Sequence, residues 1–311
     1  MDTLGNVLEY RFYEMPQGCQ NSVGDFTKTA DDGVVAWGSD TSFFAIRVNA
    51  DLSARWGKRF TGQGGFHFIK ELPGGDLLAG INMETAGAVV ARMDAEGNFL
   101  WCKSYMRPKG MMNDAIIESD SSFIITGYTD STQTNIFTPL PSTFQPKLFM
   151  MKLSGDGAVQ WCRGWQSPTN LWYTRKYCTI ERTPDGRIIV LSTLAYPENH
   201  LWYRPFLMKT DQSGDTLWTR SMGRDDYRYK TQNLTVAADG GILMSGIIYG
   251  DMPGGNSSLE YIYKVDSLGH FPCWERFHPV QTMDLFPVDS SFTLIAEDVP
   301  VIATPVLVTD S

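Results

Sequence analysis

The chain has 311 residues, of which 42% are apolar and 13% aromatic, and its net charge is −9. This acidic balance, without any long basic run, argues against nucleic acid and anionic lipid as partners. No stretch reaches the ~18 apolar residues of a membrane-spanning helix, so we expect no direct insertion into a membrane. The apolar content is sufficient for a sizeable core in one large domain or two of ordinary size.

A turn followed by an indole recurs along the chain. An Asp-like residue is followed three positions later by Gly, and four positions after that by Trp. Complete copies lie at Asp94, Gly97, Trp101 and at Asp211, Gly214, Trp218, and degenerate copies end at Glu9, Trp56, Trp161 and Cys273. These six terminal positions are 47, 45, 60, 57 and 55 residues apart. Such a period, with strands on both sides of the turn, predicts a propeller or an array of β units.

Each unit has the pattern of four strands. In the second unit, alternating apolar and polar residues predict strands at 66–72, 76–81, 88–93 and 98–105, separated by turn residues such as Gly74 and Gly75. We expect the repeated indoles to be structural and to fill the space between neighbouring blades, because a Trp side chain buries a large area. These indoles are Trp56, Trp101, Trp161 and Trp218.

Six tight turns between the first and second strands predict six units. We place them at residues 21–60, 66–105, 112–165, 177–221, 230–277, and 280–311 together with 1–13. The last unit has only three strands after Val280, and the unpaired strand at 6–13 supplies the fourth. The prediction is therefore one all-β domain over 1–311. It is a six-bladed β-propeller with four strands per blade, whose ring is closed by the N-terminal strand joining the C-terminal blade.

This repeat resembles a known style of propeller. The tight Asp-Gly turn, two strands, a basic residue, Asp-x-x-Gly and an aromatic resemble the propeller repeats of Bacteroidetes exported proteins, many of which are type IX secretion cargo. The resemblance covers essentially the whole chain and implies a secreted protein, at the cell surface, outside the cell or in the periplasm. The chain also opens inside a motif with no leader before it, so we expect a mature or excised form of a longer parent protein. The repeat is also similar to the tryptophan-docking motif of quinoprotein dehydrogenases. The spacing between Asp and Gly differs in that motif, so we assign no quinone-binding residue to this chain.

The five cysteines give little indication of a disulfide, redox or metal-binding role. Cys102, Cys162 and Cys273 occupy repeat positions, where a buried small hydrophobe is the simplest interpretation. A Cys162–Cys178 disulfide stays open as an alternative if the protein is exported. No CxxC or Cys/His cluster has zinc spacing, so we expect no metal and no cofactor.

The long connections carry the first group of candidate binding residues. In a four-stranded blade, the turns between strands one and two and strands three and four lie at one end, and all long segments belong to the other end. Those segments are rich in Trp, Tyr and Arg, the residue types of recognition surfaces. The candidates are Trp165, Trp172, Tyr173, Arg175, Tyr196, His200, Trp202, Tyr203, Arg204 and Arg228. Packing of large loops onto their own blades is the alternative.

A second group of polar residues begins the innermost strands, at the mouth of the expected channel. They are Asp25, His67, Asn113, Asp114, Gln232, Asn233 and Asp284. Aligned polar groups around one axis could hold water, a cation or a small ligand. Hydrogen bonding between blades is the alternative that we favour.

The sequence favours binding over catalysis. The four histidines are scattered, and neither a Ser/His/Asp arrangement nor a phosphate loop is present. We therefore expect a recognition or scaffold module for a protein, peptide or glycan, without a catalytic residue, as part of a larger parent protein or an envelope assembly. The alternative is a carbohydrate-active propeller enzyme, a glycoside hydrolase or lyase, with carboxylates converging at the channel mouth.

Overall fold

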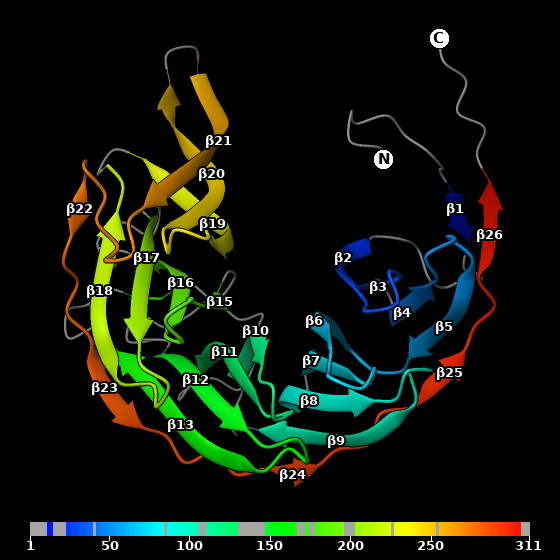
Figure 1. Ribbon diagram of the computed structural model, residues 1–311. Coiled ribbons are helices and arrows are strands. Elements are labelled where there is room, and N and C mark those ends of the chain that lie inside the picture. The colour runs from blue at the N-terminus through cyan, green and yellow to red at the C-terminus, as the bar shows by residue number, and fades with distance from the viewer. Residues whose placement is uncertain are drawn as a thin grey trace. The chain divides into compact units, whose positions relative to one another are not determined.

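The structure is a computed structural model that describes residues 11–14, 23–39, 42–83, 86–105, 110–129, 147–166, 172–173, 178–195, 203–224, 227–252 and 255–305 (Figure 1). All regular structure within these ranges is β, and they contain no helix long and apolar enough to cross a membrane. The chain divides into two compact units. One comprises Met1–Ser104 with Ser291–Ser311, and the other Tyr105–Ser290.

The first unit contains two antiparallel sheets and one strand pair. One sheet has the order β2 (Val23–Lys28), β3 (Val34–Ser39), β4 (Phe43–Val48), β5 (Ala54–Phe60) and β25 (Ala296–Asp298). The other has β6 (Gly64–Glu71), β7 (Leu77–Met83), β8 (Gly87–Met93), β9 (Phe99–Tyr105) and β24 (Ser290–Ser291). The pair consists of β1 (Arg11–Glu14) and β26 (Ile302–Pro305).

The second unit contains three sheets. The first has the order β10 (Gly110–Ile117), β11 (Phe123–Thr129), β12 (Lys147–Leu153), β13 (Val159–Gln166) and β23 (Gln281–Asp284). In the second, β14 (Trp172–Tyr173) and β15 (Thr179–Arg182) both pair with β16 (Ile188–Ala195), and β17 (Tyr203–Thr210), β18 (Thr216–Met222) and β22 (Glu275–Arg276) follow. The third has only β19 (Arg228–Val236), β20 (Ile242–Met252) and β21 (Gly255–Val265).

These sheets confirm the all-β class and the propeller-type blade, in which successive strands are neighbours. The number six is wrong, because the described residues form five blades. Residues 280–305 do not form a blade of their own. Their short strands instead pair with the outer strands of blades that already have four, β23 with β13 and β25 with β5. The turn residues at 289–291 do not predict these pairings, because a local turn signal does not specify which sheet edge a strand joins.

Pairing between the two ends of the described chain was predicted in part. Arg11 lies opposite Pro305 and Glu14 opposite Ile302, so the N-terminal strand does pair with the C-terminal segment. The two form an isolated ribbon rather than the fourth strand of a sixth blade. The fifth blade also differs from the prediction, because its fourth strand is missing. Pro272, which lacks an N–H, and Trp274, with a φ of 60°, turn the chain away after the motif turn.

The motif turns have the same local structure in both units. The backbone N–H of Asp94 donates to Asn98 O at 2.9 Å, and the N–H of Gly97 donates to Asp94 O at 3.0 Å. The Asp94 carboxylate accepts the N–H groups of Glu96 and Asn98, each at 2.9 Å. Gly97 has a φ of 77°, in the left-handed region where a side chain is costly. The Asp-x-x-Gly spacing is thus explained by turn chemistry.

The indole of one repeat packs on the glycine of the next. A Cβ on Gly97 would lie 3.2 Å from Trp56, one on Gly214 3.2 Å from Trp161, and one on Gly269 2.5 Å from Trp218. Trp56 also donates from Nε1 to Ala95 O at 2.9 Å. The predicted structural role is therefore observed for these three indoles, and Trp101 is half-buried on β9. The glycine supplies both the turn conformation and the space for the neighbouring ring.

The C-terminal segment, residues 275–305, follows the outer strands with a period of seven residues. The N–H groups of Leu285, Phe292 and Val299 donate to the carbonyls of Cys162, Cys102 and Gly57, each at 3.0 Å. Each acceptor directly follows a repeat indole. The basic residue two positions after the indole pairs with an acid of this segment, as in Lys58 with Asp298 at 2.6 Å and Arg220 with Glu275 at 2.8 Å. These basic residues therefore attach the C-terminal segment to the blades.

Candidate functional site

Six of the seven predicted channel-mouth residues, all except Asp284, lie at a β-bulge in the first strand of four blades. The strand register shifts between Val23 and Asp25, Phe66 and Phe68, Met112 and Asp114, and Thr231 and Asn233. The residues inserted at these bulges are Gly24, His67, Asn113 and Gln232, and Asp25, Asp114 and Asn233 follow directly. A bulge redirects side chains and is found near functional sites as well as at sheet irregularities. The polar cluster noticed in the sequence is thus a repeated backbone feature.

The acids beside these bulges accept backbone hydrogen bonds. Asp114 accepts the N–H of Ala115 at 2.8 Å and, from the first strand of the next blade, that of Ile180 at 3.0 Å. Asp25 is exposed and accepts the N–H of Phe26 at 2.8 Å. The Asp114 contact joins two neighbouring blades, as the alternative interpretation of this group required.

The remaining members of this group differ in environment. His67 is half-buried on β6, and burial lowers its pKa to about 4, so the ring is neutral at pH 7. The Asn113 amide oxygen is buried and has no hydrogen-bond partner within the described part of the chain. Asn233 is exposed and lies 3.5 Å from the Ser245 hydroxyl. Asp284 does not belong here, because it lies on β23, the strand added to β13, where it pairs with Arg163.

Two predicted loop residues are in the core. Trp165 lies within β13, is fully buried, and donates from Nε1 to the Thr216 hydroxyl at 2.8 Å. Arg204 lies on β17 and is only 3% exposed. Because neither side chain reaches the surface, their assignment to a recognition surface is corrected. The strand β13 continues through Gln166, further along the chain than the sequence pattern indicates.

The other loop candidates are only partly described. Tyr203 and Arg228 are half-buried at the starts of β17 and β19. Trp172 and Tyr173 form β14, and their backbones pair with Ala195 and Leu194 of β16. Arg175, Tyr196, His200 and Trp202 lie outside the described residues. Residues 249–252 and 255–260 belong to the long strands β20 and β21, with Tyr249 opposite Ser258.

The two ends of each blade differ in their connections. At one end, the turn end, every connection is short and closed by the same hydrogen bond, from the N–H of one residue to the carbonyl four positions later. The turns begin at Thr29, Asn49, Leu72, Asp94, Glu118, Ser154, Thr183, Asp211, Ala237 and Asp266. At the other end, the connection end, the links range from residues 253–254 to residues 130–146. Variation in length is confined to the connection end, as the sequence predicted.

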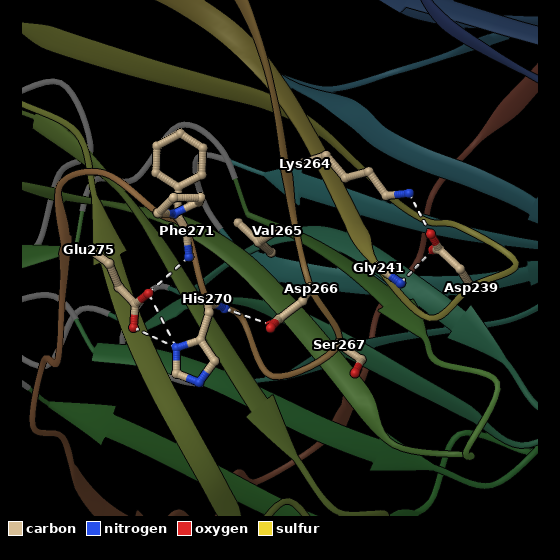
Figure 2. A pocket seen from close by; sticks show the side chains of 10 residues that line it. Asp239, Gly241, Lys264, Val265, Asp266, Ser267, His270, Phe271 and Glu275 are labelled. Atoms are coloured by element: carbon tan, nitrogen blue, oxygen red, sulfur yellow. Dashed lines mark hydrogen bonds and ion pairs between the residues drawn. The ribbon is translucent and has the colours of Figure 1, made fainter.

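A surface pocket of about 680 Å³ lies at the last motif turn, in the second unit (Figure 2). Its walls come from the turn after β19, the end of β21 and residues 266–275. Lys264 pairs with Asp239 on one side (Figure 2). On the other side, the Glu275 carboxylate accepts the N–H of Phe271 at 2.8 Å and lies 3.1 Å from His270 Nδ1.

Two carboxylates of this pocket, Asp239 and Glu275, are held as anions by their neighbours. The hydrogen bond from Lys264 keeps the pKa of Asp239 below its usual value. Partial burial acts to raise the pKa of Glu275, but hydrogen bonds from Phe271 and His270 outweigh it and lower that pKa. Asp266 accepts the N–H groups of Leu268 and His270 at 2.9 and 2.8 Å. These contacts are those of the motif turn and stabilise it.

The cysteines carry no disulfide among the residues described. Cys162 and Cys178 are both buried free thiols, so the bridge left open by the sequence is not formed. Burial raises the pKa of each to about 12, which keeps them protonated. Cys102 is also a free thiol whose pKa burial raises to about 12. Within the same residues, no group of three or more His, Cys, Asp or Glu side chains could hold a metal ion.

Comparisons with known proteins assign this chain to no family. The strand order within its sheets defines this chain as an all-β protein of propeller-type blades. No protein-family model matches the sequence, and no curated protein matches it. Among solved structures, the chain is similar to a protein of unknown function from Bacteroides caccae, with 12% identity and a TM-score of 0.35. That match covers 78% of this chain and 91% of the other. A likeness of this size carries no functional argument.

Proposed function

We propose that this chain is a non-catalytic recognition or scaffold module of an exported bacterial protein. It would bind a protein, a peptide or a glycan at the connection end of its blades. The observation that supports this most directly is the difference between the two ends, because only the connection end varies in length. Loops that vary on a rigid scaffold are the usual carriers of binding residues.

The residue types of the connections support the same proposal. Residues 165–177 and 196–205 contain three Trp and four Tyr residues, together with two Arg residues. Aromatic rings provide contact area with few rotatable bonds, and they stack on sugars as well as on peptide groups. Since Trp165 and Arg204 are buried, the proposed surface is restricted to the remaining candidates, chiefly Trp172, Tyr173, Trp202 and Tyr203. The parent protein would be located at the cell surface, outside the cell or in the periplasm.

The test combines a glycan array with a pull-down from the envelope of the source organism. If the connections recognise a ligand, Trp172→Ala or Trp202→Ala should weaken binding by ~1–3 kcal/mol with little change in melting temperature. The matched control is Leu100→Ala, which removes a side chain that is 55% exposed at the turn end. Equal effects of all three substitutions, or a ligand footprint at the turn end, would contradict the proposal. Release of reducing ends from a bound glycan would replace it with the glycosidase alternative.

A further inference from the structure

The blade formed by β19, β20 and β21 has an open edge. In the four other blades, the third strand pairs with a fourth strand on its outer side. Within the described residues, no strand pairs with the outer side of β21, which projects beside β20 in Figure 1. An unpaired strand edge presents backbone N–H and C=O groups and is a ready template for another strand.

The side chains along this edge form a self-complementary sequence. Residues 260–264 are Glu-Tyr-Ile-Tyr-Lys, which is symmetrical about Ile262 except that its two ends carry opposite charges. Glu260, Ile262 and Lys264 share one face of the strand, since side chains alternate along it. All three are exposed, and Ile262 is 75% exposed. Tyr261, on the other face, is buried in the core of the blade.

We propose that β21 is a self-association edge that pairs antiparallel with β21 of a second copy of this chain, with Ile262 on the two-fold axis. In this register, Ile262 lies opposite Ile262 and each Tyr opposite a Tyr. Glu260 of each copy then faces Lys264 of the other. Registers centred on Glu260 or on Lys264 would place like charges opposite each other, which destabilises a strand pair. A contact of this kind is isologous and closes on itself as a dimer.

The intramolecular contacts of these residues leave them able to pair. Lys264 contacts Asp239 of its own blade, but the two side chains are 51% and 60% exposed, and an ammonium group has three donors. Glu260 has no ion-pair partner among the residues described. A second copy is the occupant that the sequence selects, because a strand from another protein would need the same charge order by coincidence.

Sedimentation velocity over a concentration series, up to about 1 mM where weak complexes appear, tests the proposal. Wild-type protein should show a monomer–dimer equilibrium. Glu260→Lys and Lys264→Glu should each weaken dimerisation about tenfold or more, since each places two like-charged pairs across the axis. An equimolar mixture of the two variants should dimerise again, and so should the double variant. Recovery in the mixture cannot be explained by misfolding of either variant.

Two further measurements sharpen the result. Amide hydrogen exchange should become slower over residues 260–264 as the protein concentration rises. Ile262→Lys should abolish the dimer, whereas Ile295→Lys, at a side chain 59% exposed and outside any strand, should leave it unchanged. A protein that stays monomeric throughout, or a dimer unaffected by both charge reversals and by Ile262→Lys, would overturn the proposal.

Discussion

Two blades place the same pair of repeat residues in different surroundings. Arg47 and Asp31 of the β2–β5 blade correspond to Lys264 and Asp239 of the β19–β21 blade, and both pairs join the third strand to the first tight turn. Arg47 is 3% exposed, whereas Lys264 is 51% exposed. The difference comes from a neighbour. Arg47 also donates to Ala95 O, at 3.2 Å, and to Glu71, both of the next blade.

A repeat residue such as Arg47 therefore acquires its burial from the following blade rather than from its own. No described blade follows β21, so the positions that are interior elsewhere remain at the surface there. The pocket at the last motif turn has the same origin, since it is lined by the turn and strand residues that another blade would cover. In repeat architectures, stability is largely the sum of such contacts between neighbours.

The largest expected loss of stability follows from removing an indole that packs against the next blade. Trp56→Ala should lower the free energy of unfolding by ~3–5 kcal/mol, because it opens a cavity against Gly97 and removes the hydrogen bond to Ala95. The counterpart is Trp274→Ala, at an indole that is 51% exposed. It should cost less than about 1 kcal/mol. Urea unfolding monitored by circular dichroism measures both, and equal losses would contradict the comparison.

The second effect separates turn conformation from neighbour packing. Gly269 and Gly74 both have positive φ, 77° and 100°. A Cβ on Gly269 would lie 2.5 Å from Trp218, whereas one on Gly74 would meet nothing within 4 Å. Gly74→Ala should therefore cost only the backbone strain, about 1–2 kcal/mol. Gly269→Ala should cost clearly more, because the indole must shift, and a melting temperature no lower than that of Gly74→Ala would show that the indole contact is unimportant.

The features that the sequence predicted well are those fixed locally. Asp94 and Gly97 define their turn by hydrogen bonds within five residues, and the indole spacing then sets the strand that follows. The sixth blade failed because residues 280–305 contain turn residues at the right spacing but pair with strands far away in the chain. The seven-residue recurrence of Leu285, Phe292 and Val299 was the available sign of an edge-following segment.

The candidate site was harder to predict than the fold. The polar residues from Asp25 to Asn233 could be found because bulges recur at one repeat position. Sequence alone could not show that the Asp114 carboxylate accepts a hydrogen bond from the backbone N–H of Ile180. Trp165 was assigned to a loop because the fourth strand was expected to end sooner. The open edge at β21 could not be predicted for the same reason as the number of blades. It depends on which strand residues 271–276 pair with, and the local sequence does not specify that partner.

A pH effect is expected from a histidine at a bulge. The pKa of His67 is lowered by burial from 6.5 to about 4, so the unfolded chain binds a proton more readily than the folded one. Stability is therefore full above about pH 6.5 and falls as the pH decreases toward 4. A shift of this size corresponds to at most ~3 kcal/mol, and less is expected because the ring is only half-buried. His67→Gln should flatten the stability profile between pH 6.5 and 4. Parallel profiles for the wild type and His67→Gln would exclude this histidine as a source of acid sensitivity.

The smallest expected effect on stability is at the exposed ion pair of the β19–β21 blade, and its counterpart is the buried pair of the β2–β5 blade. Arg47→Met should cost roughly 2 kcal/mol or more, because the carboxylate of Glu71, 12% exposed, loses its ion pair with Arg47 in a region from which water is largely excluded. Lys264→Met should cause no measurable loss, since side-chain ordering and solvent screening offset the attraction between exposed charges. Thermal unfolding at low protein concentration, where self-association does not contribute, measures both substitutions. Raising the salt concentration should leave the difference between Arg47→Met and wild type nearly unchanged, because a buried pair is screened little. A marked loss of stability for Lys264→Met that salt reduces would mean that the Lys264–Asp239 pair is shielded from solvent. In that case the edge of β21 would not be open in solution.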